Sequence, residues 1–373
     1  MFIIIYFFLF HLFNFNTIST IKLIRHGARF PNGEVLKEYS EKGMEYRGQL
    51  TKLGKQQLFE LGQYFKNLIN DKLLNSINFS SSFSKRCIES TEEFMKGMDI
   101  NSLTIEILPP KIIKPYKLNK TVKSKQHLIE NKFHHIIENL WNQARVYDFE
   151  NVIYEYCKKC TKVSHPSEKL KQLKKMSSIH YCNSANEMIH SKYHEELIPI
   201  IHKSYRLFYY RIAHNSKKSA VSYISELLII IGETFLYQIN KNSYYNELIQ
   251  KTKNIFNSEK KYSKFNFIIL HEGNITAFLK IFVKTKKLIK EDFYTPKFSS
   301  YIGFDLIKLN KNILKCDSKE INQILRHESN IYNEEYFVKI YFLEKELYIK
   351  ECSYLRCQLS TFIIYLYNLL NNN

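Results

Sequence analysis

The sequence predicts an α/β fold: a three-layer sandwich with a mainly parallel central sheet flanked by helices, plus a helical insert or cap. Three observations support this. Short apolar runs alternate with segments of helical periodicity towards both ends of the chain. The middle, residues 111–255, has almost no glycine and long helical periodicities. Two histidines, His26 and His271, directly follow apolar runs, at the strand ends where the chemistry of α/β sheets gathers.

Before the insert, apolar runs and helical periodicity predict four elements: a strand at 21–24, helices at 51–68 and 84–97, and a strand at 103–108. Thr51 is a residue type that caps helix N-termini, so it marks the start of the first helix. Pro109 and Pro110 stop the second strand because proline cannot donate to a strand ladder.

The insert and the segments after it complete the pattern. Within the insert, helical periodicity is clearest at 133–146 and 219–239. After it come a buried strand at 265–270, a helix at 275–284, strands near 300–308 and 335–341, and a helix at 359–370. We therefore predict a core formed by residues 20–110 and 256–373, with residues 111–255 inserted between them as a helical cap.

Composition narrows the class of protein. Hydrophobic residues make up 45% and aromatic residues 15% of the 373 residues, which excludes a disordered chain. The net charge of +19 is that of many nucleic-acid binders. The lysines are scattered along the chain, however, within a general bias towards Lys, Asn and Ile, so we expect no nucleic-acid partner.

The N-terminal sequence is typical of a targeting segment. Met1–Leu12 is almost wholly apolar, too short to span a bilayer comfortably but long enough for the core of a signal peptide. Thr17 and Ser19 are small enough for a cleavage site, so we predict a signal peptide at 1–19 and a secreted or lysosomal/vacuolar protein. No Lys or Arg precedes the apolar run, and a retained membrane anchor or a buried strand are the alternatives. We expect no membrane span in the mature chain.

The seven cysteines fit an oxidising compartment. Cys352 and Cys357 are close enough to close a small loop. The C-x-x-C at 157–160 is typical of zinc or redox sites, but no second such pair follows it, and we favour disulfides. Sequons begin at Asn78 and Asn119 and predict a glycoprotein if the chain is secreted.

Residues Ile24–Pro31, with the sequence IRHGARFP, contain the main candidate for chemistry. This segment places His26 between Arg25 and Arg29 on a tight turn. An imidazole between two guanidinium groups can attack a phosphoryl group while the cations hold its oxygens. No acid lies near these arginines in sequence before Glu34, so the partner expected for them is a bound phosphate.

This segment resembles the R-H-G-x-R-x-P signature of the histidine acid phosphatases, branch 2 of the histidine phosphatase superfamily. Four more segments resemble that family in the expected order: an L-T-x-x-G-x-x-Q pattern at 50–57, an S-x-x-x-x-R-x-x-x-S pattern at 81–90, the position of the H-D motif at 271–274, and a late cysteine pair at 352–357. The resemblance covers about residues 21–370, and the insert matches least.

The resemblance implies a mechanism. His26 is the nucleophile and forms a phosphohistidine. Arg25, Arg29 and Arg86 hold the phosphoryl oxygens, and His271 is a further donor to them. These cationic groups supply the charge, so the resemblance implies no metal and no other cofactor.

The chain departs from the family at Glu272, where relatives have the aspartate that protonates the leaving alcohol. Glu272 keeps the carboxyl group with one more methylene, so we expect it to act as the general acid. The alternative is a lost geometry and slow turnover. Asn274 matches a family position that binds substrate, and its alternative role is to cap a helix.

The implied activity is that of an acid phosphatase acting on small phosphate monoesters. Two alternatives stay open: an inositol-polyphosphate (phytase-like) phosphatase, and a non-catalytic secreted homologue that binds phosphate or another ligand. The sequence does not set the leaving group, and a homodimer stays open as the assembly.

Overall fold

The computed structural model describes a sheet-based core and parts of the insert. The described residues are 15–30, 48–69, 76–100, 102–113, 134–145, 216–283, 296–309, 335–347, 349, 351–352 and 357–372, together with single residues 169, 173, 182, 199, 200 and 203.

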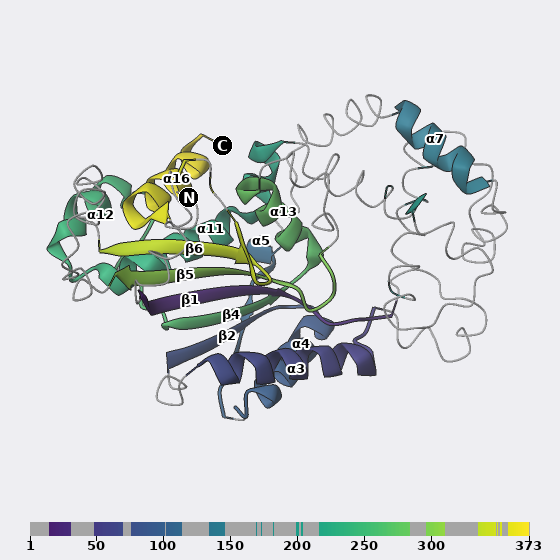
Figure 1. Cartoon of the computed structure of the whole chain (residues 1–373), viewed down its shortest axis with the longest axis horizontal. Coiled ribbons are helices and arrows are strands. Elements are labelled where there is room, and N and C mark those ends of the chain that lie inside the picture. Colours follow the sequence, from purple (N-terminus) through teal and green to yellow (C-terminus); the bar gives the residue numbers. More distant parts are fainter. Residues whose placement is uncertain are drawn as a thin grey trace, which may run out of the picture. The chain divides into compact units, whose positions relative to one another are not determined.

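Eight strands form the sheet: β1 (Phe15–Arg25), β2 (Ile77–Ser82), β3 (Ile105–Leu108), β4 (Phe265–Leu270), β5 (Tyr301–Leu309), β6 (Tyr336–Phe342), β7 (Lys345–Leu347) and β8 (Cys357–Gln358). Their order is β3-β2-β4-β1-β5-β6-β7, with β8 paired to β6 (Figure 1). The strands that carry the predicted site residues, β1 and β4, are neighbours in the middle of this order.

The sheet is mixed. β2 and β3 are parallel. β1 and β4 also run in the same direction, because Thr20 N–H donates to the Lys264 carbonyl and His26 N–H donates to the Leu270 carbonyl. β6 pairs antiparallel with β5, β7 and β8. The α/β prediction with a mainly parallel central sheet and flanking helices is confirmed, and the antiparallel strands extend one side of it.

The described helices are α3 (Lys52–Leu68), α4 (Lys85–Gly97), α5 (Pro110–Ile113), α7 (His134–Arg145), α11 (Lys217–Ile239), α12 (Asn246–Thr252), α13 (Glu272–Phe282) and α16 (Leu359–Asn371), with a 3-10 turn at Ser243–Tyr245. Every helix predicted by periodicity is present near its expected position. The strand at 265–270 is confirmed at both ends, but β2 was not predicted, because half of its residues are serines.

Two compact units account for the described residues. One comprises those within Met1–Lys22, Glu226–Phe267 and Ile302–Asn373; the other comprises those within Leu23–Ser225 and Ile268–Tyr301. Every residue of the candidate site belongs to the second unit. The predicted boundaries of the insert, 111 and 255, stay a prediction, since much of that segment lies outside the described residues.

In the second unit, α3 and α4 pack closely together. A Cβ on Gly62 would lie 2.2 Å from the Phe94 carbonyl oxygen, and one on Gly97 would lie 2.0 Å from that of Phe59. Phe65 of α3 contacts both Phe94 of α4 and Tyr301 at the start of β5. This packing holds the two helices against each other and places α3 against the start of β5.

The structure bears on only some of the predictions about the signal peptide, the cysteines and glycosylation. β1 begins at Phe15, inside the predicted signal peptide, while residues 1–14 lie outside the described residues. The predicted pair Cys352–Cys357 is a disulfide. The C-x-x-C at 157–160 and Asn119 are outside the described residues.

One described helix, α11, is long and apolar enough to cross a membrane, so the expectation that no segment after the N-terminus has this length and composition was wrong. Of its most apolar stretch, 61% is buried inside the protein, as in the core helix of a globular domain.

Candidate active site

The turn Arg25-His26-Gly27-Ala28 is held by the backbone of neighbouring segments. Arg25 N–H donates to the Ser300 carbonyl at 2.8 Å, and His26 N–H donates to the Leu270 carbonyl at 3.0 Å. Both residues are buried. The end of β1 is therefore fixed from both sides, and its side chains project at one edge of the sheet.

The start of α3 packs directly on this turn. A Cβ on Gly27 would lie 2.2 Å from the Gly54 carbonyl oxygen, and one on Gly54 would lie 2.0 Å from the Ala28 carbonyl oxygen. Only glycine fits at either position, because backbone faces backbone. Thr51 caps the helix by accepting the Gly54 N–H, and its hydroxyl donates to the Ala28 carbonyl. The predicted cap is confirmed.

Two side chains accept the N–H groups of the turn. Gln57 of α3 accepts the Ala28 N–H at 3.0 Å, and Ser90 of α4 accepts the Gly27 N–H at 3.2 Å. These buried donors would cost free energy without acceptors. The two residues thus explain the spacing of the 50–57 and 81–90 segments: each motif ends on an acceptor for the turn that carries His26.

His26 has the protonation state of a nucleophile. Its Nδ1 lies 2.9 Å from the Gly27 carbonyl oxygen, which can only accept, so Nδ1 carries the proton. Arg86 Nε–H donates to its Nε2 at 3.2 Å, so Nε2 carries a lone pair. Burial, followed by the charges of Arg86 and Arg25, lowers the pKa of His26 well below its ordinary value of 6.5. The ring is therefore neutral in mild acid.

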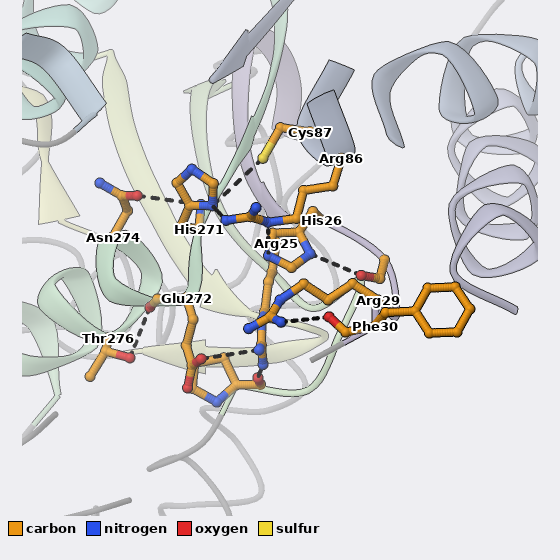
Figure 2. A network of polar contacts seen from close by, with 12 residues as sticks. Arg25, His26, Arg29, Phe30, Arg86, Cys87, His271, Glu272, Asn274 and Thr276 are labelled. Atoms are coloured by element: carbon orange, nitrogen blue, oxygen red, sulfur yellow. Dashed lines mark hydrogen bonds and ion pairs between the residues drawn. The ribbon is translucent and has the colours of Figure 1, made fainter. Parts of the chain in front are cut away.

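Arg86 lies between the two histidines (Figure 2). It is the second residue of α4, and besides its bond to His26 its Nη2 lies 3.3 Å from His271 Nδ1. The rings of His26 and His271 have their centroids 5.6 Å apart. Burial, with Arg29 nearby, lowers the pKa of the Arg86 guanidinium, but arginine stays charged in proteins.

His271 directly follows β4 and is the N-cap residue of α13. Its backbone N–H donates to Asn274 Oδ1 at 3.3 Å, and the Asn274 N–H donates back to the His271 carbonyl. Asn274 is fully buried. The structure thus gives Asn274 the capping role that was the alternative to substrate binding.

Arg25 and Glu272 form a buried ion pair. Nη2 of Arg25 lies 3.0 Å from Oε2 of Glu272, and its Nη1 donates to the Pro296 carbonyl. The guanidinium lies over the Phe298 ring, 4.2 Å from the centroid. A bound phosphate was the partner expected for this arginine, whereas the structure pairs it with an acid from α13, 247 positions away.

Arg29 and Cys182, from different parts of the chain, also lie at the site. Arg29 is buried, and its Nη1 donates to the Phe30 carbonyl at 2.8 Å. Cys182, within the predicted insert, is a buried cysteine that packs with Ala28 and Phe298. Burial raises the pKa of Cys182, and the charges of Arg29 and Arg25 oppose this. The segment predicted as an insert therefore contributes Cys182 beside the turn that carries His26.

Taken together, the described residues bring a neutral histidine, three arginines, a second histidine and a carboxylate to one sheet edge. None of them forms a cluster of three or more His, Cys, Asp or Glu side chains that could hold a metal ion. The sequence profile of the histidine phosphatase superfamily (branch 2) matches residues 19–222, more than half of the chain. The chain belongs to this family.

Solved structures of this family share the fold. The phytase from Hafnia alvei matches with a TM-score of 0.59 and 14% identity, covering 95% of this chain and 97% of its own. The phytase from Citrobacter braakii matches with a TM-score of 0.59 and 15% identity, covering 95% and 98%. A multiple inositol polyphosphate phosphatase from Bifidobacterium longum, in complex with inositol hexasulfate, matches with a TM-score of 0.54 and 11% identity, covering 93% of this chain and 91% of its own. Comparison with curated protein sequences gives no significant match.

All the site residues expected for a histidine phosphatase lie together. Sequence reasoning missed Ser82, Pro296 and Phe298. Ser82 could have been found, since it lies within the 81–90 segment. Pro296 contributes a carbonyl oxygen and Phe298 a ring face under Arg25, and neither feature has a signature in a single sequence.

Proposed function

We propose that this member of the phosphatase family hydrolyses phosphate monoesters through a phosphohistidine on His26. The observation that carries the proposal is the pair of contacts made by the His26 ring nitrogens. Nδ1 of His26 lies 2.9 Å from the Gly27 carbonyl oxygen, and its Nε2 accepts a hydrogen bond from Arg86. A histidine with a low pKa, surrounded by guanidinium groups, is a nucleophile matched to an anionic substrate.

Substrate binding exchanges internal partners for phosphoryl oxygens. Arg86 moves its Nε–H from His26 to the substrate, which uncovers the nucleophilic lone pair. Arg25 and Arg29 bind further oxygens, and His271 acts through Arg86, whose Nη2 lies 3.3 Å from His271 Nδ1. Donors that are already in place stabilise the charge that grows on these oxygens in the transition state.

In the first chemical step, the His26 Nε2–P bond forms, the bond from phosphorus to the leaving oxygen breaks, and Glu272 gives its proton to that oxygen. In the second step, water attacks phosphorus, the P–N bond breaks, and the Glu272 carboxylate takes the proton from the water. His26 returns to its neutral form and phosphate leaves.

The ion pair with Arg25 bears on the role of Glu272. Arg25 cannot serve the phosphate and the carboxylate equally well, because both are anions that use the same guanidinium. A phosphate beside Glu272 adds negative charge, and a negative neighbour favours the protonated carboxyl group. Substrate binding thus converts Glu272 from an internal partner of Arg25 into an acid.

His26→Ala tests the proposal. Phosphate release from 4-nitrophenyl phosphate at pH 5 should fall by at least about 10³-fold, because the covalent route is removed. His134→Ala is the matched control, since His134 is an exposed histidine on α7. Wild-type activity in His26→Ala would refute the proposal. A denaturing quench during turnover separates a hydrolase from the non-catalytic binder, which forms no phosphorylated protein.

The phytase-like alternative is favoured by the solved structures, which are phytases and inositol polyphosphate phosphatases. At these identities they show the fold alone, so the substrate needs an assay. We propose to compare kcat/KM for inositol hexakisphosphate with that for simple aryl and alkyl phosphates. A clear preference for the inositol substrate would replace the general acid phosphatase activity.

We also propose that the protein acts outside the cytosol, as a secreted or lysosomal/vacuolar enzyme. The apolar N-terminus and the Cys352–Cys357 disulfide support this. The signal peptide and glycosylation at Asn78 or Asn119 are part of the same proposal. N-terminal sequencing and glycosidase treatment of the protein secreted by its own host would test them.

A further inference from the structure

A continuous chain of hydrogen bonds runs through the site and begins at Ser82. Ser82 is the last residue of β2 and is fully buried. Its Oγ lies 2.9 Å from His271 Nε2. The chain continues from His271 Nδ1 to Arg86 Nη2, and from Arg86 Nε to His26 Nε2. Figure 2 shows the part that joins His271, Arg86 and His26.

The donors in this chain can be assigned from its chemistry. A guanidinium has five N–H donors and no acceptor, so neutral His271 must accept from Arg86 at Nδ1. The single ring proton of His271 is then on Nε2 and donates to Ser82 Oγ. Cys87 does not decide the assignment, because its Sγ lies 3.7 Å from Nδ1 and also 3.7 Å from the Leu270 carbonyl oxygen, to which its single S–H donates.

The other tautomer of His271 would put N–H against N–H at Arg86. Arg86 would then lose its partner on this side, and the direction of its Nε–H towards His26 would no longer be fixed. Arg86, which can only donate, therefore selects the tautomer, and Ser82 is the group that the structure shows on the opposite nitrogen, where its oxygen accepts the Nε2–H that this tautomer carries.

We infer that Ser82 is a positioning residue for phosphoryl transfer: it holds His271 as the Nε2–H tautomer, so that His271 aligns Arg86 with His26 and the phosphate. The effect on catalysis rests on the proposed function, whereas the tautomer and its effect on anion binding do not. Ser82 does not touch the reacting atoms and acts through two other side chains.

The test compares Ser82→Ala with Ser82→Thr and Ser80→Ala. Ser80 is the matched control, since it is a buried serine two positions earlier on β2 whose hydroxyl donates to Glu106 at 2.9 Å, away from the site. Ser82→Ala should lower kcat/KM for 4-nitrophenyl phosphate and the affinity for inorganic phosphate by about 10-fold each. Ser82→Thr, which keeps the hydroxyl, and Ser80→Ala should stay within about 3-fold of wild type.

A spectroscopic measurement keeps the inference testable whatever the variants do. Imidazole ¹⁵N shifts of the phosphate-free wild type at neutral pH should show His271 protonated at Nε2 and unprotonated at Nδ1. The opposite tautomer would overturn the inference, as would unchanged phosphate affinity in a folded Ser82→Ala. If the wild type shows this tautomer and binds phosphate but turns nothing over, the proposed function fails and the positioning role stands.

Discussion

Replacing Glu272 by Gln should have opposite effects on ligand binding and on catalysis. The carboxylate and Arg25 are both buried and 3.0 Å apart, so the substitution leaves a buried guanidinium without its counter-charge. Breaking such a pair costs about 3–5 kcal/mol. We expect the lower end, about 3 kcal/mol, because the Pro296 carbonyl and the Phe298 ring still face Arg25.

In Glu272→Gln, bound inorganic phosphate supplies the negative charge that Arg25 has lost, and it no longer competes with the Glu272 carboxylate for this guanidinium. Phosphate should therefore bind Glu272→Gln about 10-fold more tightly than wild type, which corresponds to about 1.4 kcal/mol. Isothermal calorimetry measures this directly, and thermal unfolding should show a larger rise in Tm with phosphate than the wild type shows.

Catalysis should change in the other direction and depend on the leaving group. An alkyl phosphate needs a proton on its leaving oxygen, so kcat should fall by about 10²–10⁴-fold, whereas 4-nitrophenyl phosphate should lose much less. Glu272→Asp keeps a carboxyl group and should keep activity. Glu233→Gln is the matched control: it is equally buried, at 7% exposure, but binds Asn257 and Tyr262 instead of the site. Equal loss with both leaving groups, together with unchanged phosphate affinity, would refute the reasoning.

Three further outcomes follow from the structure. Since the pKa of His26 is lowered, the folded protein protonates this ring only well below pH 6.5. The value of kcat/KM should therefore begin to fall only below pH 6.5. The free energy of unfolding should decline as pH falls from 6.5 towards the pKa of His26 in the folded protein, because the unfolded chain binds that proton first. Gly54→Ala should destabilise the protein by about 2–3 kcal/mol and lower the kcat of the folded fraction, because it displaces the turn that carries His26. Gly62→Ala should destabilise the protein by a similar amount and leave kcat unchanged. Activity assays alongside chemical unfolding measure both effects. Replacing Cys352 and Cys357 by serine should cost about 2 kcal/mol, measured by urea unfolding against the oxidised wild type.

The sequence predicted most of the site because its groups lie in short, ordered segments. Arg25, His26 and Arg29 are nearly adjacent, and Arg86 lies at the start of a clearly periodic helix. The apolar run before His271 marks the end of a strand, and strand ends meet at one edge of an α/β sheet. Local pattern and fold class together were therefore enough to assemble these groups.

The partners of those residues could not be predicted in the same way. The ion pair of Arg25 with Glu272 depends on where α13 starts relative to β1, which sequence spacing does not fix. β2 was missed because a run of serines lacks the β-branched residues by which strands are recognised. Ser82 lies within the recognised 81–90 segment, but its proposed role depends on a hydrogen bond to His271 that sequence spacing does not reveal.

The most direct test of the central claim is to trap the covalent intermediate. Wild-type protein mixed with a ³²P-labelled monoester and quenched in alkaline denaturant, which preserves phosphohistidine, should carry label on one peptide, and mass spectrometry should locate it on His26. His26→Ala should take up none under the same conditions. Turnover without any label on His26, or label on another residue, would contradict the account.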